Sequence, residues 1–205
     1  MTRSILLCLA LATPAYAGEP ATDRDHEIAL ALEAAPAALA EKAGVWVHDK
    51  DGYVKARESH NGFVCVVDHR IPAASEPQCL DAEGVRTFFP KLQMVAALRA
   101  KGTPEPEIRK AVAHAFKSGK LQAPRRPGVI YMLSPHNVVT LDEEKGVVAP
   151  FPGHLMFYAP GLTSADLGSD GTPASPLFVV DEKSPHALMI VPVPPPGSGH
   201  AHGAP

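Results

Sequence analysis

The N-terminal segment constrains the folding of this chain most, because it determines the compartment in which the chain folds. Arg3 gives a positively charged start, residues 5–12 form a short apolar run, and the small-x-small site Ala15-Tyr16-Ala17 follows. This pattern is typical of a cleavable secretory signal peptide. The apolar run is far below the roughly 20 residues that a spanning helix needs. We therefore expect removal of residues 1–17, export to the periplasm or the extracellular space, and no remaining membrane anchor.

Two cysteines, Cys65 and Cys79, remain after such processing. An even number of cysteines in an oxidising compartment predicts a disulfide between them. A bridge that closes a loop of about 15 residues contributes about 3 kcal/mol to stability. Pro72 and Pro77 lie between the cysteines, and the absence of clear periodicity there indicates a loop. The alternative is that Cys65 acts as a nucleophile or metal ligand, although neither cysteine belongs to a Cys-x-x-Cys motif.

Composition and charge limit the class of protein. The chain has 205 residues, of which 45% are hydrophobic, and this is enough for one domain with a sizeable core. It carries 19 basic and 22 acidic residues. Nucleic-acid and anionic-membrane surfaces need clustered basic charge, so this balance predicts neither partner. We expect a single domain over residues 18–193 and a disordered Pro-, Gly- and His-rich tail over residues 194–205.

Helical patterns occur at the N-terminus and in the centre of the chain. Residues 25–43 are rich in Ala, Leu and Glu, with a break at Pro36, and residues 90–100 carry apolar side chains at helical spacing. A third helix should begin after Thr103 and end at Gly119. It carries the stripe of a core-facing helix, formed by Ile108, Val112, Ala115 and Phe116.

Short β-rich runs separated by turn residues occupy the rest of the chain. Residues 45–47 and 53–57 flank an Asp-Gly turn, and residues 63–67 follow an Asn-Gly turn, which predicts a three-strand antiparallel meander. Four further strands are expected, over residues 128–133, 154–158, 177–180 and 187–191. The predicted fold class is α+β, an antiparallel sheet of short strands with N-terminal and central helices and one disulfide.

Several short stretches form a recognisable set: residues 57–65 (RESHNGFVC), 79–81 (CLD) and 131–133 (YML), and the two strands that follow His154 and His186. Together they resemble an uncharacterised family of exported bacterial proteins. Its members show an Arg-Glu-Gly-x-Asn-Gly-aromatic-x-Cys stretch and a His-containing, proline-ended C-terminal strand. The resemblance covers about residues 44–193, and Ser59 replaces the expected glycine. It implies export, a disulfide and a single domain, but it transfers no activity to any residue.

The common catalytic motifs are absent from the sequence. It has no Gly-x-Ser-x-Gly elbow, no P-loop and no dinucleotide fingerprint. His26-Glu27 begins like a zinc-protease helix, but Leu30 stands where the second histidine belongs. The sequence therefore favours an exported non-enzymatic domain, either a ligand-binding module or an accessory protein, and leaves catalysis open. No cofactor is predicted.

Histidine and methionine form one candidate metal site. His154 and Met156 are two residues apart on a predicted strand, so they should share a face, and His186 opens a similar strand. Imidazole and thioether suit copper among the transition metals. The alternative functional hypothesis is thus a metal-binding protein or metal-dependent enzyme that uses His154 and His186. The structural alternative is core packing by methionine, with histidine as a polar tip near solvent.

A polar loop forms a second candidate site. Arg57, Glu58, His60 and Asn61 lie at a turn between two predicted strands, where side chains are held in place and could recognise a small polar ligand. The alternative is a solvated, salt-bridged hairpin loop.

Overall fold

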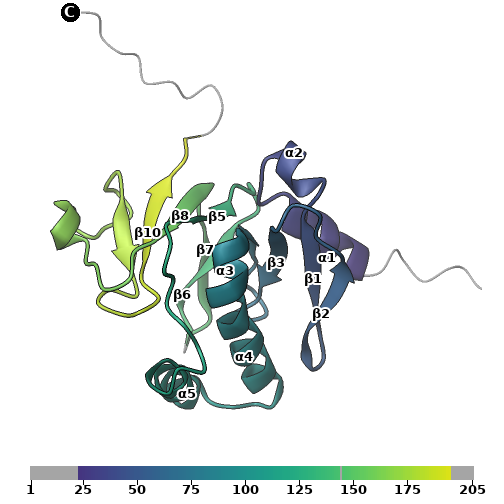
Figure 1. The fold of residues 1–205 in the computed structure, drawn as a ribbon, viewed down its shortest axis with the longest axis horizontal. Helices are drawn as coiled ribbons and strands as arrows, with labels where there is room; N and C mark the ends of the chain where they lie inside the picture. Colours follow the sequence, from purple (N-terminus) through teal and green to yellow (C-terminus); the bar gives the residue numbers. More distant parts are fainter. Residues whose placement is uncertain (1–22, 144, 195–205) are drawn as a thin grey trace, which may run out of the picture.

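The computed structural model describes residues 23–143 and 145–194, and one large sheet forms its frame (Figure 1). Eight strands lie in the order β2-β1-β3-β4-β5-β8-β10-β9, and all neighbours are antiparallel except β1 and β3. The strands are β1 (Gly44–Asp49), β2 (Gly52–Arg57), β3 (Val64–Asp68), β4 (Glu76–Leu80), β5 (Val129–Met132), β8 (His154–Tyr158), β9 (Phe178–Val180) and β10 (Leu188–Pro192). The predicted α+β class and mostly antiparallel sheet are confirmed.

One face of the sheet packs against two N-terminal helices, α1 (Asp23–Leu32) and α2 (Ala37–Ala40). Successive side chains of a strand point to opposite faces, so alternate residues of β1 and β3 turn toward these helices. They pack with small helical side chains in a cluster that includes Ala31, Ala34, Val45, Val47, Cys65, Val67 and Cys79. The alanines let the helices approach the sheet closely.

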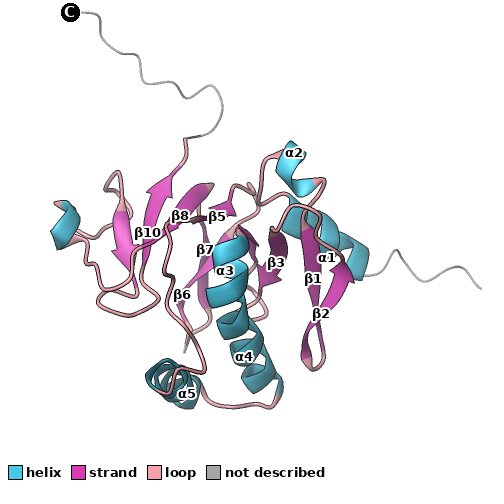
Figure 2. Ribbon diagram, in the orientation of Figure 1, coloured by secondary structure: helices cyan, strands magenta, loops and turns pink. Residues whose placement is uncertain are grey.

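The other face carries the central helices, α3 (Ala82–Thr87) and α4 (Phe89–Ala100), which run nearly in line (Figure 2). Phe88 and Phe89, where one helix passes into the next, join a core with strand residues such as Val66, Leu80 and Ile130. The last helix, α5 (Glu105–Lys117), packs on α4 through Ile108, Val112 and Ala115. Three residues of the predicted apolar stripe of α5 are thus buried against a helix, whereas Phe116 is partly exposed and lines a cavity described below.

A small second sheet lies beside the large one. It is the hairpin of β6 (Val138–Asp142) and β7 (Val147–Pro150), and a bridge between Ser75 and Val138 joins it to the segment before β4. A single 3-10 turn, η1 (Ala165–Leu167), follows β8. Neither β6 nor β7 is among the strands predicted from the sequence.

The predicted meander is wrong in its third strand. β1 and β2 form the expected hairpin, but β3 pairs with the other side of β1 in parallel, with Gly44 opposite Val64. The connecting segment 58–63 crosses back to the end of α2, where two hydrogen bonds hold it: His60 N donates to Lys42 O at 2.8 Å, and Asn61 Nδ2 donates to Leu39 O at 2.8 Å. Parallel pairing follows from this crossing.

The disulfide between Cys65 and Cys79 is confirmed, but its setting is not a loop. The two residues lie directly opposite each other on β3 and β4, with their Cα atoms 4.0 Å apart. Both are fully buried beneath α1, where Cys79 Sγ lies 3.6 Å from Ala31 O. The loop expected between the cysteines is therefore shorter than predicted, because residues 76–80 belong to β4.

Two other predictions concern residues outside the described ranges. The signal segment, residues 1–17, lies outside the described residues, as does nearly all of the predicted tail. Across residues 23–143 and 145–194, no helix has the length and apolar character needed to cross a bilayer.

Candidate ligand-binding site

Two adjoining cavities open on the α4 side of the sheet. The helical cavity, of about 1000 Å³, lies among α4, α5 and the loop after β9, including residues 181–186. The sheet chamber, of about 390 Å³, lies between the sheet and the β6–β7 hairpin. Both are in the range of small-molecule sites. They share a set of lining residues, which we call the junction: Asp68, Arg70, Lys91, Leu92 and Asp181.

The sheet chamber is lined mainly by apolar side chains. Its floor comes from alternate positions of the strands, and Leu141, Ala149 and Phe151 close it from the side of the hairpin. The floor residues are Ile130, Met132, Met156, Phe178, Leu188 and Ile190, all of which belong to the main core cluster. An apolar body of matching shape would bury its surface here.

One amide, that of Gln78, opens into the chamber. Gln78 is 6% exposed, lines the chamber, and lies on the same face of β4 as Glu76 and Leu80. Its amide is not among the fully enclosed polar atoms of the described chain that lack a hydrogen bond, so it faces the chamber. A bound molecule with a polar group at this position could form a hydrogen bond with the amide.

Glu76 is the buried acid of the chamber. Desolvation by burial raises its pKa to about 7, against the opposing charge of Arg70. The Arg70 Nε atom lies 3.7 Å from Glu76 Oε1, and Arg70 Nη1 lies 3.9 Å from Glu143 Oε1. The half-exposed Arg70 therefore divides its charge between two carboxylates, and Glu76 can carry a proton near neutral pH.

His154 presents a hydrogen-bond acceptor to the same chamber. It is 2% exposed, and its Nδ1 lies 2.9 Å from Pro152 O, which can only accept a hydrogen bond. Burial lowers the pKa of the ring, so His154 is neutral, Nδ1 carries the hydrogen and Nε2 has a free lone pair. The expectation of a polar tip near solvent is wrong for this residue. Phe151 packs against its ring at 4.9 Å, edge to face.

The predicted metal ligands do not share one cavity. His154 and Met156 line the sheet chamber, where Met156 belongs to the core cluster, whereas His186 lines the helical cavity. No group of three or more His, Cys, Asp or Glu side chains that could hold a metal ion occurs within the described residues. The transition-metal site stays a prediction from the sequence.

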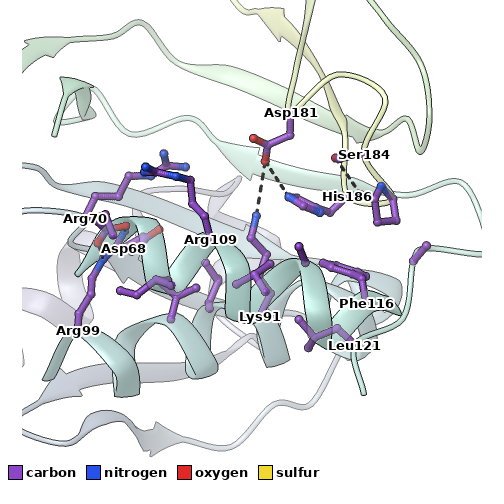
Figure 3. Close-up of a pocket in the computed structure, with 18 of the residues that line it drawn as sticks. Asp68, Arg70, Lys91, Arg99, Arg109, Phe116, Leu121, Asp181, Ser184 and His186 are labelled. Carbon is purple, nitrogen blue, oxygen red and sulfur yellow. Dashed lines mark hydrogen bonds and ion pairs between the residues drawn. The ribbon is translucent and has the colours of Figure 1, made fainter. Parts of the chain in front are cut away.

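Charged side chains meet at the junction (Figure 3). Asp181 Oδ2 lies 3.5 Å from Lys91 Nζ and 3.3 Å from His186 Nε2, so one oxygen contacts both nitrogens. The hydrogen bond from His186 is the largest factor that lowers the pKa of Asp181. His186 stacks on Phe116 of α5 at 4.9 Å. The backbone of Asp181 is left-handed, with φ of 52°, which is uncommon for a residue with a side chain and concentrates at functional sites.

A second group of charges holds the cavity wall together. Arg99 Nε donates to Glu105 Oε1 at 2.6 Å, and Arg99 also lies 3.9 Å from Asp68 and 3.7 Å from Glu143. These contacts join α4 to α5, to the end of β3 and to the segment after β6. Because each charged side chain of this group has a partner of opposite charge, we interpret the group as structural support for the cavities.

The predicted loop site lies outside both cavities. Arg57 donates from Nε to Ala43 O at 2.8 Å and bonds to Ala40 O, and Asn61 bonds to Leu39 O, so both residues secure the end of α2. Glu58 forms an exposed pair with Lys55 at 2.9 Å. These residues and His60 line neither cavity. The structure brings them together as a connection between backbone segments, and ligand binding there stays a prediction.

The sequence alone does not single out four of the cavity residues: Lys91, Asp181, Glu76 and Gln78. Glu76 and Gln78 had a readable signal, because polar residues at alternate positions beside Cys79 and Leu80 fit a strand with one polar patch. Asp181 directly follows a predicted strand, where ligand-binding side chains often lie. Lys91 had no signal, because a lysine on a helix is usually solvated.

Comparison with known proteins does not assign the chain to a family. No family model matches the chain, and no match was found among curated proteins or solved structures. The resemblance to the exported bacterial family therefore stays a prediction, and we infer the function from the two cavities.

Proposed function

We propose that this protein is an exported binding protein for a small amphipathic molecule. The apolar body of the ligand occupies the sheet chamber, and its polar end lies at the junction beside Lys91 and Asp181. The observation that carries the proposal is the sheet chamber itself, about 390 Å³ in volume and lined mainly by apolar side chains, into which the Gln78 amide opens. A polar group in an apolar pocket fixes the orientation of a bound molecule.

The polar atoms of the chamber describe the ligand further. His154 Nε2 accepts a hydrogen bond, Gln78 can donate and accept, and Glu76 can do either according to its protonation. A few convergent polar groups within an apolar pocket are typical of small-molecule sites, where they fix the orientation of the ligand. We infer a ligand that carries at least one hydrogen-bond donor within its apolar body.

The binding test uses 1-anilinonaphthalene-8-sulfonate, an aromatic anion whose fluorescence rises in apolar surroundings. The folded protein should bind it saturably. Ile190→Phe fills the chamber floor and should weaken binding by about tenfold, which corresponds to about 1.4 kcal/mol. Leu162→Phe adds the same bulk at a residue that is 37% exposed, and it should leave binding unchanged. Equal binding by both variants, with native near-UV circular dichroism, would contradict the proposal.

Export is the second part of the proposal, and the predicted signal together with the buried disulfide supports it. The full chain, expressed in a Gram-negative host, should appear in the periplasmic fraction or the medium. Its intact mass should correspond to a chain that begins at Gly18 with two fewer hydrogens than the dithiol form. A cytosolic protein that retains Met1 would disprove export.

A further inference from the structure

Lys91 has an unusual position for a lysine. It lies in the first turn of α4, lines both cavities, and its side chain is only 19% exposed. Within the described part of the chain, its one ion pair is with Asp181 at 3.5 Å, and that carboxylate is itself shared with His186. Figure 3 shows the Lys91 side chain extending from α4 toward Asp181, with a dashed line between the two groups. The nitrogen therefore stands where a molecule passing between the two cavities would meet it.

The surroundings of Lys91 lower the pKa of its ammonium group, so the neutral amine is more accessible than in a solvated lysine. Desolvation is the largest effect and lowers the pKa of the ammonium group, and the nearby charge of Arg70 acts in the same direction, whereas Asp181 and Asp68 oppose it. A lysine that is desolvated, or placed beside another cation, is the usual form of an amine nucleophile in proteins. The free lone pair of such an amine attacks carbonyl carbon.

We propose that Lys91 binds aldehydes or ketones covalently, as an imine, when their apolar part occupies the sheet chamber. This inference rests on the proposed function and names the ligand class of the same site. The neutral amine adds to the carbonyl carbon to give a carbinolamine. The carbinolamine then loses its hydroxyl group as water, and a C=N bond to Nζ replaces the C=O bond. No oxidant or reductant takes part, and addition of water reverses the reaction.

Asp181 and His186 can serve as positioning residues for this step. The Oδ2 atom of Asp181 holds both Lys91 Nζ and His186 Nε2, so the amine and the imidazole are directed to the same point. The proton that the amine nitrogen loses goes to the departing hydroxyl group, which leaves as water, and the His186 imidazole lies beside the same carboxylate, where it can relay that proton. The left-handed backbone at Asp181 keeps the carboxylate in this place.

The test traps the imine. The folded protein is incubated with cinnamaldehyde and sodium cyanoborohydride, which reduces imines to stable secondary amines, and the labelled lysines are mapped by peptide mass spectrometry. Lys91 should be labelled at least about tenfold faster than Lys50 and Lys110, although their side chains are 85% and 74% exposed. Lys91→Arg should abolish the fast label, and the matched variant Lys50→Arg should retain it. Labelling that simply follows exposure would overturn the inference.

The two proposals fail separately. If the wild-type protein binds 1-anilinonaphthalene-8-sulfonate saturably but Lys91 is labelled no faster than Lys50, the imine is wrong and the binding site stands. If Ile190→Phe leaves the binding of the naphthalene probe unchanged, the chamber is wrong as the ligand site, whatever the label shows. Asp181→Asn offers a further readout: because the Asp181 carboxylate raises the pKa of Lys91, its loss should shift the pH profile of labelling at Lys91 to lower pH.

Discussion

Tyr158 donates its hydroxyl hydrogen to Asp81 Oδ1 at 2.7 Å, across 77 positions of sequence. The same carboxylate accepts from Gly84 N at 2.8 Å through Oδ1 and from Val129 N at 2.8 Å through Oδ2. One side chain thus caps α3 and ties it to β5 and β8. Burial and the bond to Asp81 both raise the pKa of Tyr158, so the phenol stays a donor. Because α4 follows α3 directly, this contact also positions Lys91.

The first prediction concerns the close approach at Gly84. A β-carbon on Gly84 would overlap with the Tyr158 hydroxyl oxygen and would lie 3.1 Å from Leu80 Cβ. Tyr158→Phe should cost about 1.5–3 kcal/mol through the lost bond to a charged group. Gly84→Ala should cost more than that in the wild type, but less in the Tyr158→Phe background, where the oxygen is gone. A double-mutant cycle by urea unfolding measures this coupling, and additive costs would contradict it.

The second prediction concerns the buried disulfide. Replacement of Cys65 and Cys79 together by alanine should lower the free energy of unfolding by about 3 kcal/mol, because the unfolded chain regains the entropy of a loop of about 15 residues. Urea unfolding of the wild type should shift to the same extent when dithiothreitol is added. The double variant should not respond to the reductant. An equal midpoint for the two proteins would show that the crosslink contributes nothing.

The order of elements along the chain could largely be predicted, because periodicity is local. The apolar stripe of α5 and the alternation within β8 each lie inside a few turns or residues, and both appear as expected. Pairing could not be predicted in the same way. β3 lies beside β1 in parallel, and His60 and Asn61 hold the crossing by bonds to backbone near α2, about 20 residues away. Contacts at that range leave no period in the sequence.

The candidate site was harder to predict than the fold. His154 and Met156 do share a face, as alternation in a strand requires, but the partner of each depends on which strands become neighbours. Lys91 and Asp181 are 90 positions apart and meet only because the loop after β9 reaches α4. Arg57 and Asn61 were predicted as ligand-binding residues, but they bond to backbone carbonyl groups. The sequence pattern of polar residues near a turn is the same in both cases.

The third prediction is a pH dependence that originates at Glu76. Burial raises its folded-state pKa to about 7 from an ordinary 4.5, so the folded protein holds this proton more tightly than the unfolded chain. The stability contribution is therefore fully present below about pH 4.5 and is lost as the pH rises through about 7. Its size is about 3 kcal/mol. Glu76→Gln should remove it, giving a flatter profile of unfolding free energy from pH 4.5 to 8.

The matched control for Glu76 is Glu58→Gln, at a side chain that is 70% exposed, and its profile should follow that of the wild type. Both variants remove one carboxylate from the protein, so the difference between their profiles reports the buried position of Glu76. Parallel profiles for Glu76→Gln and the wild type would show that the buried carboxyl has an ordinary pKa.

The fourth prediction is that the empty protein gains stability from a substitution in its own site. Gln78→Leu replaces an amide that opens into the chamber by an apolar side chain of similar size. It adds apolar surface to a mainly apolar lining and breaks no hydrogen bond within residues 23–143 and 145–194, so the free energy of unfolding should rise by about 1 kcal/mol. A residue that weakens the fold and lines a cavity is typical of a group kept for binding.

Gln93→Leu, on α4 and outside both cavities, serves as the control and should change stability by less than about 0.5 kcal/mol. If Gln78→Leu instead unfolds at lower urea than the wild type, the amide stabilises the fold, and its assignment as a group kept for ligand binding is wrong.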